Sequence, residues 1–263
     1  MGTFDHLWPS HISAKQGTHL KKKRASQAGP RTSSAGQPVQ NELLQAMTAR
    51  EFSLLRPHLQ SVDLVAHHVL YEPGDVLKYI YFPNRGLISL VVVLKTGKTV
   101  EAGIVGKEGA SGTALSAGIK GSALREIVQI SGDAFRVKSE AFQKVLTIAP
   151  GLRNALSRYL VLLGMQVSQT AACNRLHEIE QRLSRWLLMA EDSAASPLLK
   201  ITHDFLATML GTDRPSVTLA AGLLQKANLI EYSRGAVKIT NRSQLEAFAC
   251  ECYSVIRNYS KQV

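Results

Sequence analysis

The stretch THDFLATMLGTDRPSVTLAAGLLQK, residues 202–226, decides the fold because it has the pattern of two helices joined by a tight turn. Thr202 can cap the free amides of a first helix whose apolar residues recur at one-face spacing. Gly211 supplies the left-handed backbone that ends this helix, and Asp213 can cap the next. Pro215 is tolerated in the first turn of that second helix, where its missing amide would be unpaired anyway. The stretch therefore predicts a helix-turn-helix.

The second predicted helix has a narrow apolar face for packing and an opposite face without acidic residues. The outward residues are Arg214, Ser216, Thr218, Gly222, Gln225 and Lys226. Such a helix can lie in the phosphate-lined major groove of DNA, with Arg214 at its N-terminal end best placed to reach base edges. The alternative is an ordinary helical hairpin that contacts no DNA.

After Ile230 the pattern changes from helical to alternating, and EYSRGAVKIT (231–240) predicts a β-hairpin that turns at Arg234 and Gly235. A hairpin after a helix-turn-helix makes a winged helix-turn-helix. Ser233, Arg234 and Lys238 are then candidates for phosphate contacts, which position a protein on DNA without reading its sequence. A solvated hairpin tip is the alternative for each of them.

The length and composition of the chain allow two domains and a tail, because it has 263 residues, of which 45% are apolar. No apolar run reaches the length of a membrane span, and the N-terminus lacks the apolar core of a secretory signal, so we expect a cytoplasmic protein. The three cysteines form no disulfide framework. Cys250 and Cys252 are two apart on a predicted helix and should face away from each other, so packing explains them better than metal or redox chemistry. We expect no metal site.

Nearly half of the net charge of +11 lies in the N-terminal 38 residues. Residues 1–38 hold six Lys and Arg against Asp5 alone, and they are rich in Ser, Gly, Gln and Pro. This composition predicts a disordered basic tail. The run at 21–24, KKKR, could contact DNA or another polyanion, but a solvated arm is the commoner role of such a run.

A short helix is predicted over 41–58, followed by β-rich runs separated by glycine-containing turns as far as residue 149. Several short strands without intervening helices predict a β-sandwich or barrel, here a double-sheet jelly roll. With the helices that follow, the fold class is α+β.

Residues 150–177 have helical periodicity over about seven turns. The apolar seam of this helix suggests a parallel two-stranded coiled coil between two copies of the chain. The candidate interface residues are Leu156, Tyr159, Leu163, Val167, Thr170 and Asn174. The alternative is a long helix packed wholly on its own domain. A second helix over 178–192 leads into the winged helix-turn-helix.

A β-roll, a long helix and a C-terminal winged helix in this order resemble the Crp/Fnr superfamily of bacterial transcription regulators. The matching segments are YEPGD (71–75), YFPNRGLISL (81–90), VGKEG (105–109) and residues 201–235. The resemblance implies a tail at 1–38, a cyclic-nucleotide-binding-like sensor domain at 39–149, a dimerisation helix at 150–177 and a DNA-binding domain at 178–263. It also implies a homodimer on a palindromic double-stranded DNA operator, with RNA polymerase as a further partner and no membrane.

The resemblance also implies roles for particular residues of this chain. Thr202 falls where the family touches phosphate, and Arg214 where it commonly hydrogen-bonds a guanine. The glutamate that often follows this arginine is Pro215 here, and the later recognition arginine of the cyclic-AMP receptor protein is Leu219. The cognate operator should therefore differ from that protein's.

The effector side departs further from the family pattern. Gly106, Glu108 and Gly109 align near the family's ribose-contacting element, but the arginine-serine pair that holds the cyclic phosphate is replaced by Ser122 and Ala123. Arg125 lies two residues away, where its reach differs. Because a buried phosphate without a cation is costly, cyclic-AMP binding is disfavoured.

For the other cofactors of the family, we compare the ligand residues that each one requires with those that the sequence contains. No cysteine precedes Cys173, which excludes the family's iron–sulfur cluster. His58, His67 and His68 could ligate haem, but nothing pairs them with a second ligand, and His67 and His68 should project to opposite faces of a strand. We therefore expect no cofactor.

The leading hypothesis is a DNA-binding transcription regulator. The alternative is a ligand-sensing or protein-interaction module whose helix-turn-helix docks on a protein partner. An enzyme is not expected, because the sequence has no phosphate loop, metal-ligand cluster or nucleophile elbow.

Overall fold

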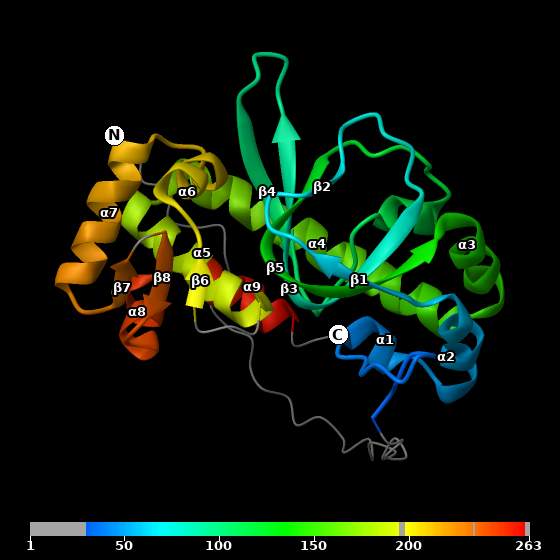
Figure 1. Ribbon diagram of the computed structural model, residues 1–263. Helices are drawn as coiled ribbons and strands as arrows, with labels where there is room; N and C mark the ends of the chain where they lie inside the picture. Colours follow the sequence, from blue (N-terminus) through cyan, green and yellow to red (C-terminus); the bar gives the residue numbers. More distant parts are fainter. Residues whose placement is uncertain (1–29, 195–197, 234, 261–263) are drawn as a thin grey trace, which may run out of the picture.

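The computed structural model describes residues 30–194, 198–233 and 235–260. An antiparallel sheet formed by the N-terminal half lies beside a helical C-terminal part with a small sheet of its own, and the long helix α4 (Pro150–Leu176) runs between them (Figure 1). The predicted α+β class is confirmed. None of the described helices is both long and apolar enough to cross a membrane.

Two short helices, α1 (Glu42–Ala46) and α2 (Ala49–Leu55), and a 3-10 turn (Arg56–His58) take the place of the single helix predicted over 41–58. The single-helix prediction is wrong because Met47 and Thr48 adopt extended backbone between the two helices. Thr48 starts α2 with a capping box, in which its Oγ1 accepts a hydrogen bond from the Glu51 amide at 3.2 Å and the Glu51 carboxylate accepts one from the Thr48 amide.

Residues 30–38 pack on these helices, although they were predicted to belong to a disordered tail. The Arg31 guanidinium donates hydrogen bonds to the carbonyls of Leu44 and Met47 and lies 4.9 Å from the Phe52 ring centroid. The prediction is wrong for this segment because Arg31 binds two backbone carbonyl groups and an aromatic ring at the same time, which holds the segment against the helices. The rest of the predicted tail, with the basic run 21–24, lies outside the described residues.

The N-terminal sheet is antiparallel, with the order β1-β5-β3-β4 and β2 also paired with β5. Its strands are β1 (Gln60–Leu64), β2 (Val69–Tyr71), β3 (Tyr79–Val93), β4 (Thr99–Val105) and β5 (Arg125–Lys138), and a 3-10 turn (Thr113–Ala117) and helix α3 (Ser139–Ile148) flank β5. The register of β3 against β5 shifts between Pro83 and Ile88. Gly132 lies at this irregularity, where a Cβ atom would come within 2.1 Å of the Arg85 carbonyl oxygen. Glycine there allows the two backbones to meet.

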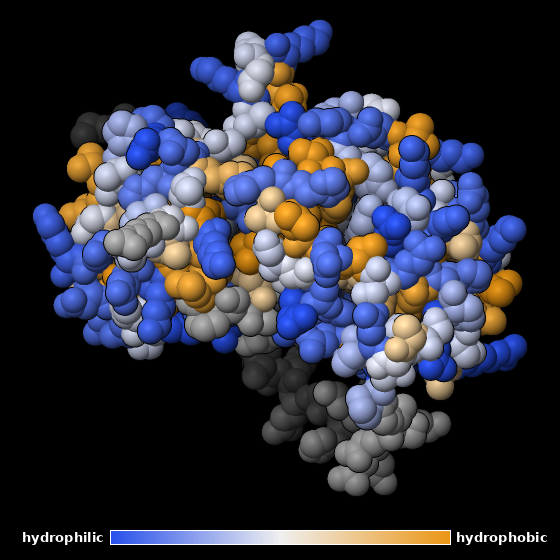
Figure 2. Space-filling model, viewed as in Figure 1, coloured by the Kyte–Doolittle hydropathy of each residue, from blue (hydrophilic) through white to orange (hydrophobic). Residues whose placement is uncertain are grey.

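The β3–β4 hairpin projects from the rest of the molecule (Figure 1). Figure 2 shows hydrophilic side chains at its tip and hydrophobic ones at its base. Lys95 and Lys98 at the tip are exposed. Helix α6 (His203–Leu210) packs against β4, so the base of the hairpin contacts the C-terminal part.

The sheet is buried on two sides. The side chains of Ile88, Leu90 and Val128 lie in the core that the roll encloses with α3 and the first turns of α4. Leu87 and Ile104 point the other way and share a second core with helix α5 (Ile179–Ala194). The two parts of the chain are therefore joined by a continuous apolar core.

The C-terminal part has the predicted winged-helix order. After α5 and α6 come α7 (Arg214–Lys226), α8 (Arg242–Phe248) and α9 (Cys252–Ser260), and the three-stranded sheet β6-β8-β7 contains β6 (Leu198–Lys200), β7 (Ile230–Ser233) and β8 (Ala236–Ile239). The predicted hairpin forms between β7 and β8, with Gly235 at a φ of 78°.

Glu101 on β4 is a buried carboxyl group at the junction of the two parts. It accepts a hydrogen bond of 2.7 Å from the indole Nε1 of Trp186 on α5, and its other oxygen is bonded to Ser89. Burial raises the pKa of Glu101 to about 7, above its ordinary value of 4.5. The protonated acid can donate to Ser89 while it accepts from Trp186, so the neutral form suits this site.

We predict that Glu101→Gln reduces the pH dependence of stability. The folded-state pKa is raised, so the wild-type contribution is fully present below about pH 4.5 and is lost as the pH rises through 7. At pH 8 the glutamine variant should exceed the wild type in free energy of unfolding by about 3 kcal/mol. Urea unfolding between pH 5 and 8 measures this, with the exposed Glu140→Gln as the control. Parallel pH profiles for wild type and Glu101→Gln would contradict it.

Candidate nucleic-acid interface

The turn between α6 and α7 is built by the residues that predicted it. Thr202 accepts a hydrogen bond of 3.3 Å from the Phe205 amide, and Gly211 ends α6 with a φ of 60°. Asp213 then caps α7 by accepting 2.8 Å from the Ser216 amide, and Pro215 lies in the first turn. These caps place the start of α7 at the surface.

Helix α7 has a buried face and an exposed face. Val217, Ala220, Ala221 and Leu224 are buried in the second core. Arg214 is 65% exposed, and two leucines on the outer face, Leu219 and Leu223, are 71% and 52% exposed. Leu223 was not predicted to point outward, although its four-residue spacing from Leu219 would have indicated it. The outer face therefore combines cationic, polar and apolar groups.

A carboxylate from the first helix of the motif reaches Arg214. Asp204 Oδ2 lies 3.5 Å from Arg214 Nη1, and both side chains are more than half exposed. The second helix is free of acidic residues, as its sequence shows, but the acid that lies beside its arginine belongs to α6. In a solvated pair this contact orients the guanidinium more than it stabilises the fold.

Thr218, a predicted DNA contact, is exposed, but its hydroxyl group has hydrogen-bond partners within the domain. Its hydroxyl donates 2.9 Å to the Arg214 carbonyl, and its Oγ1 lies 3.0 Å from His203 Nδ1. The His203 ring stacks on Tyr232 of the wing at a centroid distance of 4.1 Å. Burial and the charge of Arg214 lower the pKa of His203, which favours the neutral imidazole. His203 therefore connects α6, α7 and the wing, a role the sequence did not reveal.

The predicted wing contacts are partly described. Ser233 is exposed at the end of β7, and Lys238 is exposed on β8 in register with Glu231 of β7. Arg234 lies outside the described residues. Of these two residues, Ser233 lies beside the turn, where it can contact the phosphate backbone of DNA. Lys238 lies in the body of the sheet.

The predicted effector residues Gly106, Glu108 and Gly109 lie beside α4 and α5. Glu108 Oε1 accepts 2.8 Å from the Gly106 amide, and burial raises the pKa of this carboxyl group. A Cβ atom on Gly109 would come within 2.3 Å of the Tyr159 ring, so the tyrosine fills the space in front of this loop.

Arg125 is paired elsewhere. Its Nε lies 3.0 Å from both carboxylate oxygens of Glu72, and Ser122 Oγ donates 2.7 Å to the Leu124 carbonyl. The cation and the hydroxyl nearest to the family's phosphate position are therefore both engaged by the chain itself.

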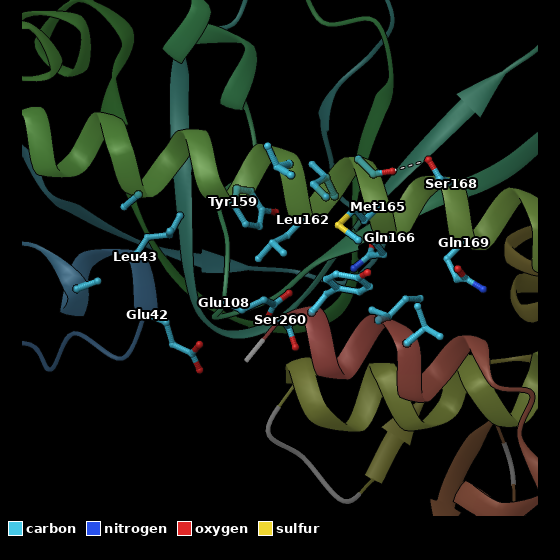
Figure 3. A pocket seen from close by; sticks show the side chains of 18 residues that line it. Glu42, Leu43, Glu108, Tyr159, Leu162, Met165, Gln166, Ser168, Gln169 and Ser260 are labelled. Atoms are coloured by element: carbon cyan, nitrogen blue, oxygen red, sulfur yellow. Dashed lines mark hydrogen bonds between the residues drawn. The ribbon is translucent and has the colours of Figure 1, made fainter. Parts of the chain in front are cut away.

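A cavity of about 650 Å³ opens between α1, α4 and α9, next to Glu108. Tyr159, Leu162 and Met165 come from α4, and Ser260 from the end of α9 (Figure 3). Its lining is mostly apolar. Of the predicted effector residues, only Glu108 lines it.

Half of the predicted dimer seam is buried within the chain itself. Leu156, Tyr159 and Thr170 are at most 6% exposed, and Leu163, Val167 and Asn174 are half-buried. The assignment of Leu156 and Tyr159 to an interface between copies is corrected, because both lie in the core of the roll. Spacing of three and four residues marks an apolar face but does not say which surface covers it.

The exposed side of α4 is small and apolar. Val161 is 65% exposed, Met165 is half-exposed, and Gly164, Ser168 and Ala172 are exposed at helical spacing. This row, Val161, Gly164, Met165, Ser168 and Ala172, is the α4 outer row.

Two expectations about possible metal ligands are corrected. His67 and His68 lie in a turn between β1 and β2, with His67 at a φ of 68°, and are exposed, so they are not on opposite faces of a strand. Cys250 precedes α9, whereas Cys252 begins it, and the two thiols do not face apart. With Cys173 and His177 they form a group whose possible ligand atoms all lie within 4.8 Å of one another.

Comparison with known proteins agrees with this arrangement. Residues 181–248 match the model of the Crp-like helix-turn-helix domain. The global nitrogen regulator of Synechococcus elongatus is 23% identical over 201 residues, which cover 73% of this chain and 90% of that protein.

Two solved structures are similar over most of their length. FixK2 from Bradyrhizobium japonicum has a TM-score of 0.62 at 13% identity, covering 73% of this chain and 98% of FixK2. A transcriptional regulator of the Crp/Fnr family from Eubacterium rectale has a TM-score of 0.60 at 15% identity, covering 78% of this chain and 96% of that one. The similarity therefore extends over both the sheet and the helix-turn-helix.

Proposed function

We propose that this chain is a DNA-binding transcription regulator of the Crp/Fnr type, which binds a palindromic operator as a homodimer without control by cyclic AMP. A match to the Crp-like helix-turn-helix domain and a fold shared with Crp/Fnr regulators support the proposal. The observation that carries the proposal is the outer face of α7, where Arg214 stands exposed at the N-terminal end. Residues at this end of a recognition helix meet base edges in the major groove. RNA polymerase is a further partner in this proposal.

Arg214 is proposed to hydrogen-bond a guanine in each half-site. Its guanidinium can donate to O6 and N7 of one guanine at once, a contact worth about 1–3 kcal/mol of discrimination. Asp204, at 3.5 Å, holds the free side chain at the helix start before DNA is bound.

We predict that Arg214→Ala lowers affinity for the cognate operator and relaxes selectivity at one base pair per half-site. The loss should be about 5- to 150-fold per half-site, which corresponds to about 1–3 kcal/mol. Operators selected from genomic fragments, followed by fluorescence anisotropy at fixed salt, provide the measurement. Arg153→Ala, an exposed arginine on α4, is the control. A variant with unchanged operator selectivity would refute the assignment.

Leu219 and Leu223 are proposed to contact thymine methyl groups. The two exposed leucines are four residues apart and form one apolar strip on the outer face of α7, and the thymine methyl is the apolar group that the major groove offers. With leucine at position 219, the operator should differ in sequence from one that is recognised by an arginine at this position.

We expect Leu219→Ala to weaken operator binding by about 1 kcal/mol, the scale of one or two buried methylene groups. The same loss should appear when the contacted thymine is replaced by uracil, which lacks the methyl, and the two changes together should cost no more than either alone. Leu94→Ala, which shortens an exposed leucine on the β3–β4 hairpin in the same way, is the control. Additive losses would show that the leucine does not touch the methyl.

The dimer is proposed to form along the α4 outer row. Small and apolar side chains at helical spacing allow two helices to approach closely, and Val161 leaves a large apolar surface in water. A two-fold axis parallel to α4 would present two copies of α7 to successive major grooves, with half-sites one helical turn apart.

Val161→Glu should convert the dimer to a monomer, because two carboxylates would face each other at the axis. Light scattering after size exclusion measures the mass, and operator affinity should fall with it. Ile148→Glu, which replaces a similarly exposed apolar residue on α3, is the matched control. A Val161→Glu protein that remains dimeric would place the interface elsewhere.

Independence from cyclic AMP is supported by the contacts of the effector residues. Arg125 is neutralised by Glu72, and Tyr159 occupies the space in front of Gly109. A cyclic phosphate bound there would have to break the Arg125–Glu72 pair and displace a buried tyrosine. The protein-partner alternative has no comparable support, since the Crp-like match covers the helix-turn-helix itself.

A further inference from the structure

Four possible metal ligands meet where α4 ends and α9 begins. Cys173 is in the last turn of α4, His177 follows that helix, and Cys250 and Cys252 flank the start of α9. The three thiols are at most 4% exposed, and the His177 side chain is 19% exposed. The ligand atoms all lie within 4.8 Å of one another. We propose that these four residues bind one zinc ion in a tetrahedral site.

The distances suit zinc. Zinc–sulfur bonds of about 2.3 Å and zinc–nitrogen bonds of about 2.0–2.1 Å give a tetrahedron with edges of about 3.8 Å between sulfurs and about 3.5 Å between sulfur and nitrogen. Here Cys173 Sγ lies 3.5 Å from Cys250 Sγ, and Cys252 Sγ lies 3.5 Å from His177 Nδ1. Three thiolates and one imidazole are a donor set of structural zinc sites, and soft sulfur ligands disfavour magnesium and calcium.

The groups around the ligands are arranged for a metal. His177 Nε2 lies 3.3 Å from Glu251 Oε1, so this nitrogen is occupied by a carboxylate and Nδ1 is directed at the thiols. A carboxylate that fixes a ligating histidine in this way is the usual second partner in zinc sites. Gln169 Nε2 donates a hydrogen bond of 3.1 Å to Cys252 Sγ, so this thiol is also oriented by a neighbouring side chain.

The charges around the cluster also favour a zinc ion bound by three thiolates. A zinc ion with three thiolates and a neutral imidazole carries a net charge of −1. Two arginines of α5 face the cluster: Arg185 is 3% exposed, and the Nε atoms of both Arg182 and Arg185 are buried without a hydrogen-bond partner. An anionic centre would compensate these buried cations.

Zinc binding would release the thiol protons, without any redox step. The ion would join the end of α4 to the start of α9 across 77 residues of sequence. Because α5 begins directly after His177, the ion would also fix the hinge from which the helix-turn-helix domain starts. The site does not depend on the proposed operator contacts.

The test uses tag-free full-length protein, purified under reducing conditions, stripped with a chelator and reloaded with zinc. We expect one zinc per chain by mass spectrometry, and cobalt substitution should give the d–d bands of a tetrahedral site and thiolate-to-cobalt charge transfer. Chelation should lower the melting temperature. Wild-type protein that retains no zinc and gives no tetrahedral cobalt spectrum would overturn the proposal, whatever the variants do.

Variants assign the ligands. Cys250→Ser and His177→Gln should weaken zinc affinity by more than 100-fold. Glu251→Gln, which acts through His177, should weaken it by about 10–100-fold, with partial recovery in Glu251→Asp. His68→Gln, an exposed histidine outside the cluster, is the control. Unchanged affinity in Cys250→Ser, or a Cys173–Cys250 disulfide in reduced, zinc-treated protein, would also overturn the proposal.

Discussion

The structure depends on the burial of both faces of one sheet. The roll encloses one face, and the other would be open to water if α5 did not cover it with Trp186 and its apolar neighbours. Area of this kind is the main source of stability in a chain of this size. The hydrogen bond from Trp186 to Glu101 lies inside this contact and gives the buried carboxyl group a partner from α5. The position of the helix-turn-helix follows from this contact between α5 and the sheet.

The elements predicted most accurately from the sequence are those whose causes are local. Thr202, Gly211 and Asp213 act on backbone within three residues of themselves, and each was found in its predicted role. Gly235 likewise turns the wing hairpin where the alternation changes. The break between α1 and α2 was missed although its signal, Thr48 followed three residues later by Glu51, is of the same local kind.

Contacts between distant segments could not be derived from spacing. The apolar positions of α4 were recognised, but a repeat of three and four residues fits a second copy and the chain's own sheet equally well. Cys173 and Cys250 are 77 residues apart, and only the fold brings their sulfurs to 3.5 Å. The pairing of Arg125 with Glu72 and the approach of Asp204 to Arg214 were hidden for the same reason. Chemistry that requires two segments to converge is therefore the part that sequence reasoning leaves open.

The last helix of the chain has a practical consequence for how the protein is handled. Helix α9 packs against α4, and Ser260 at its end lines the same cavity as Met165. A bulky label attached at Ser260 would therefore crowd this cavity.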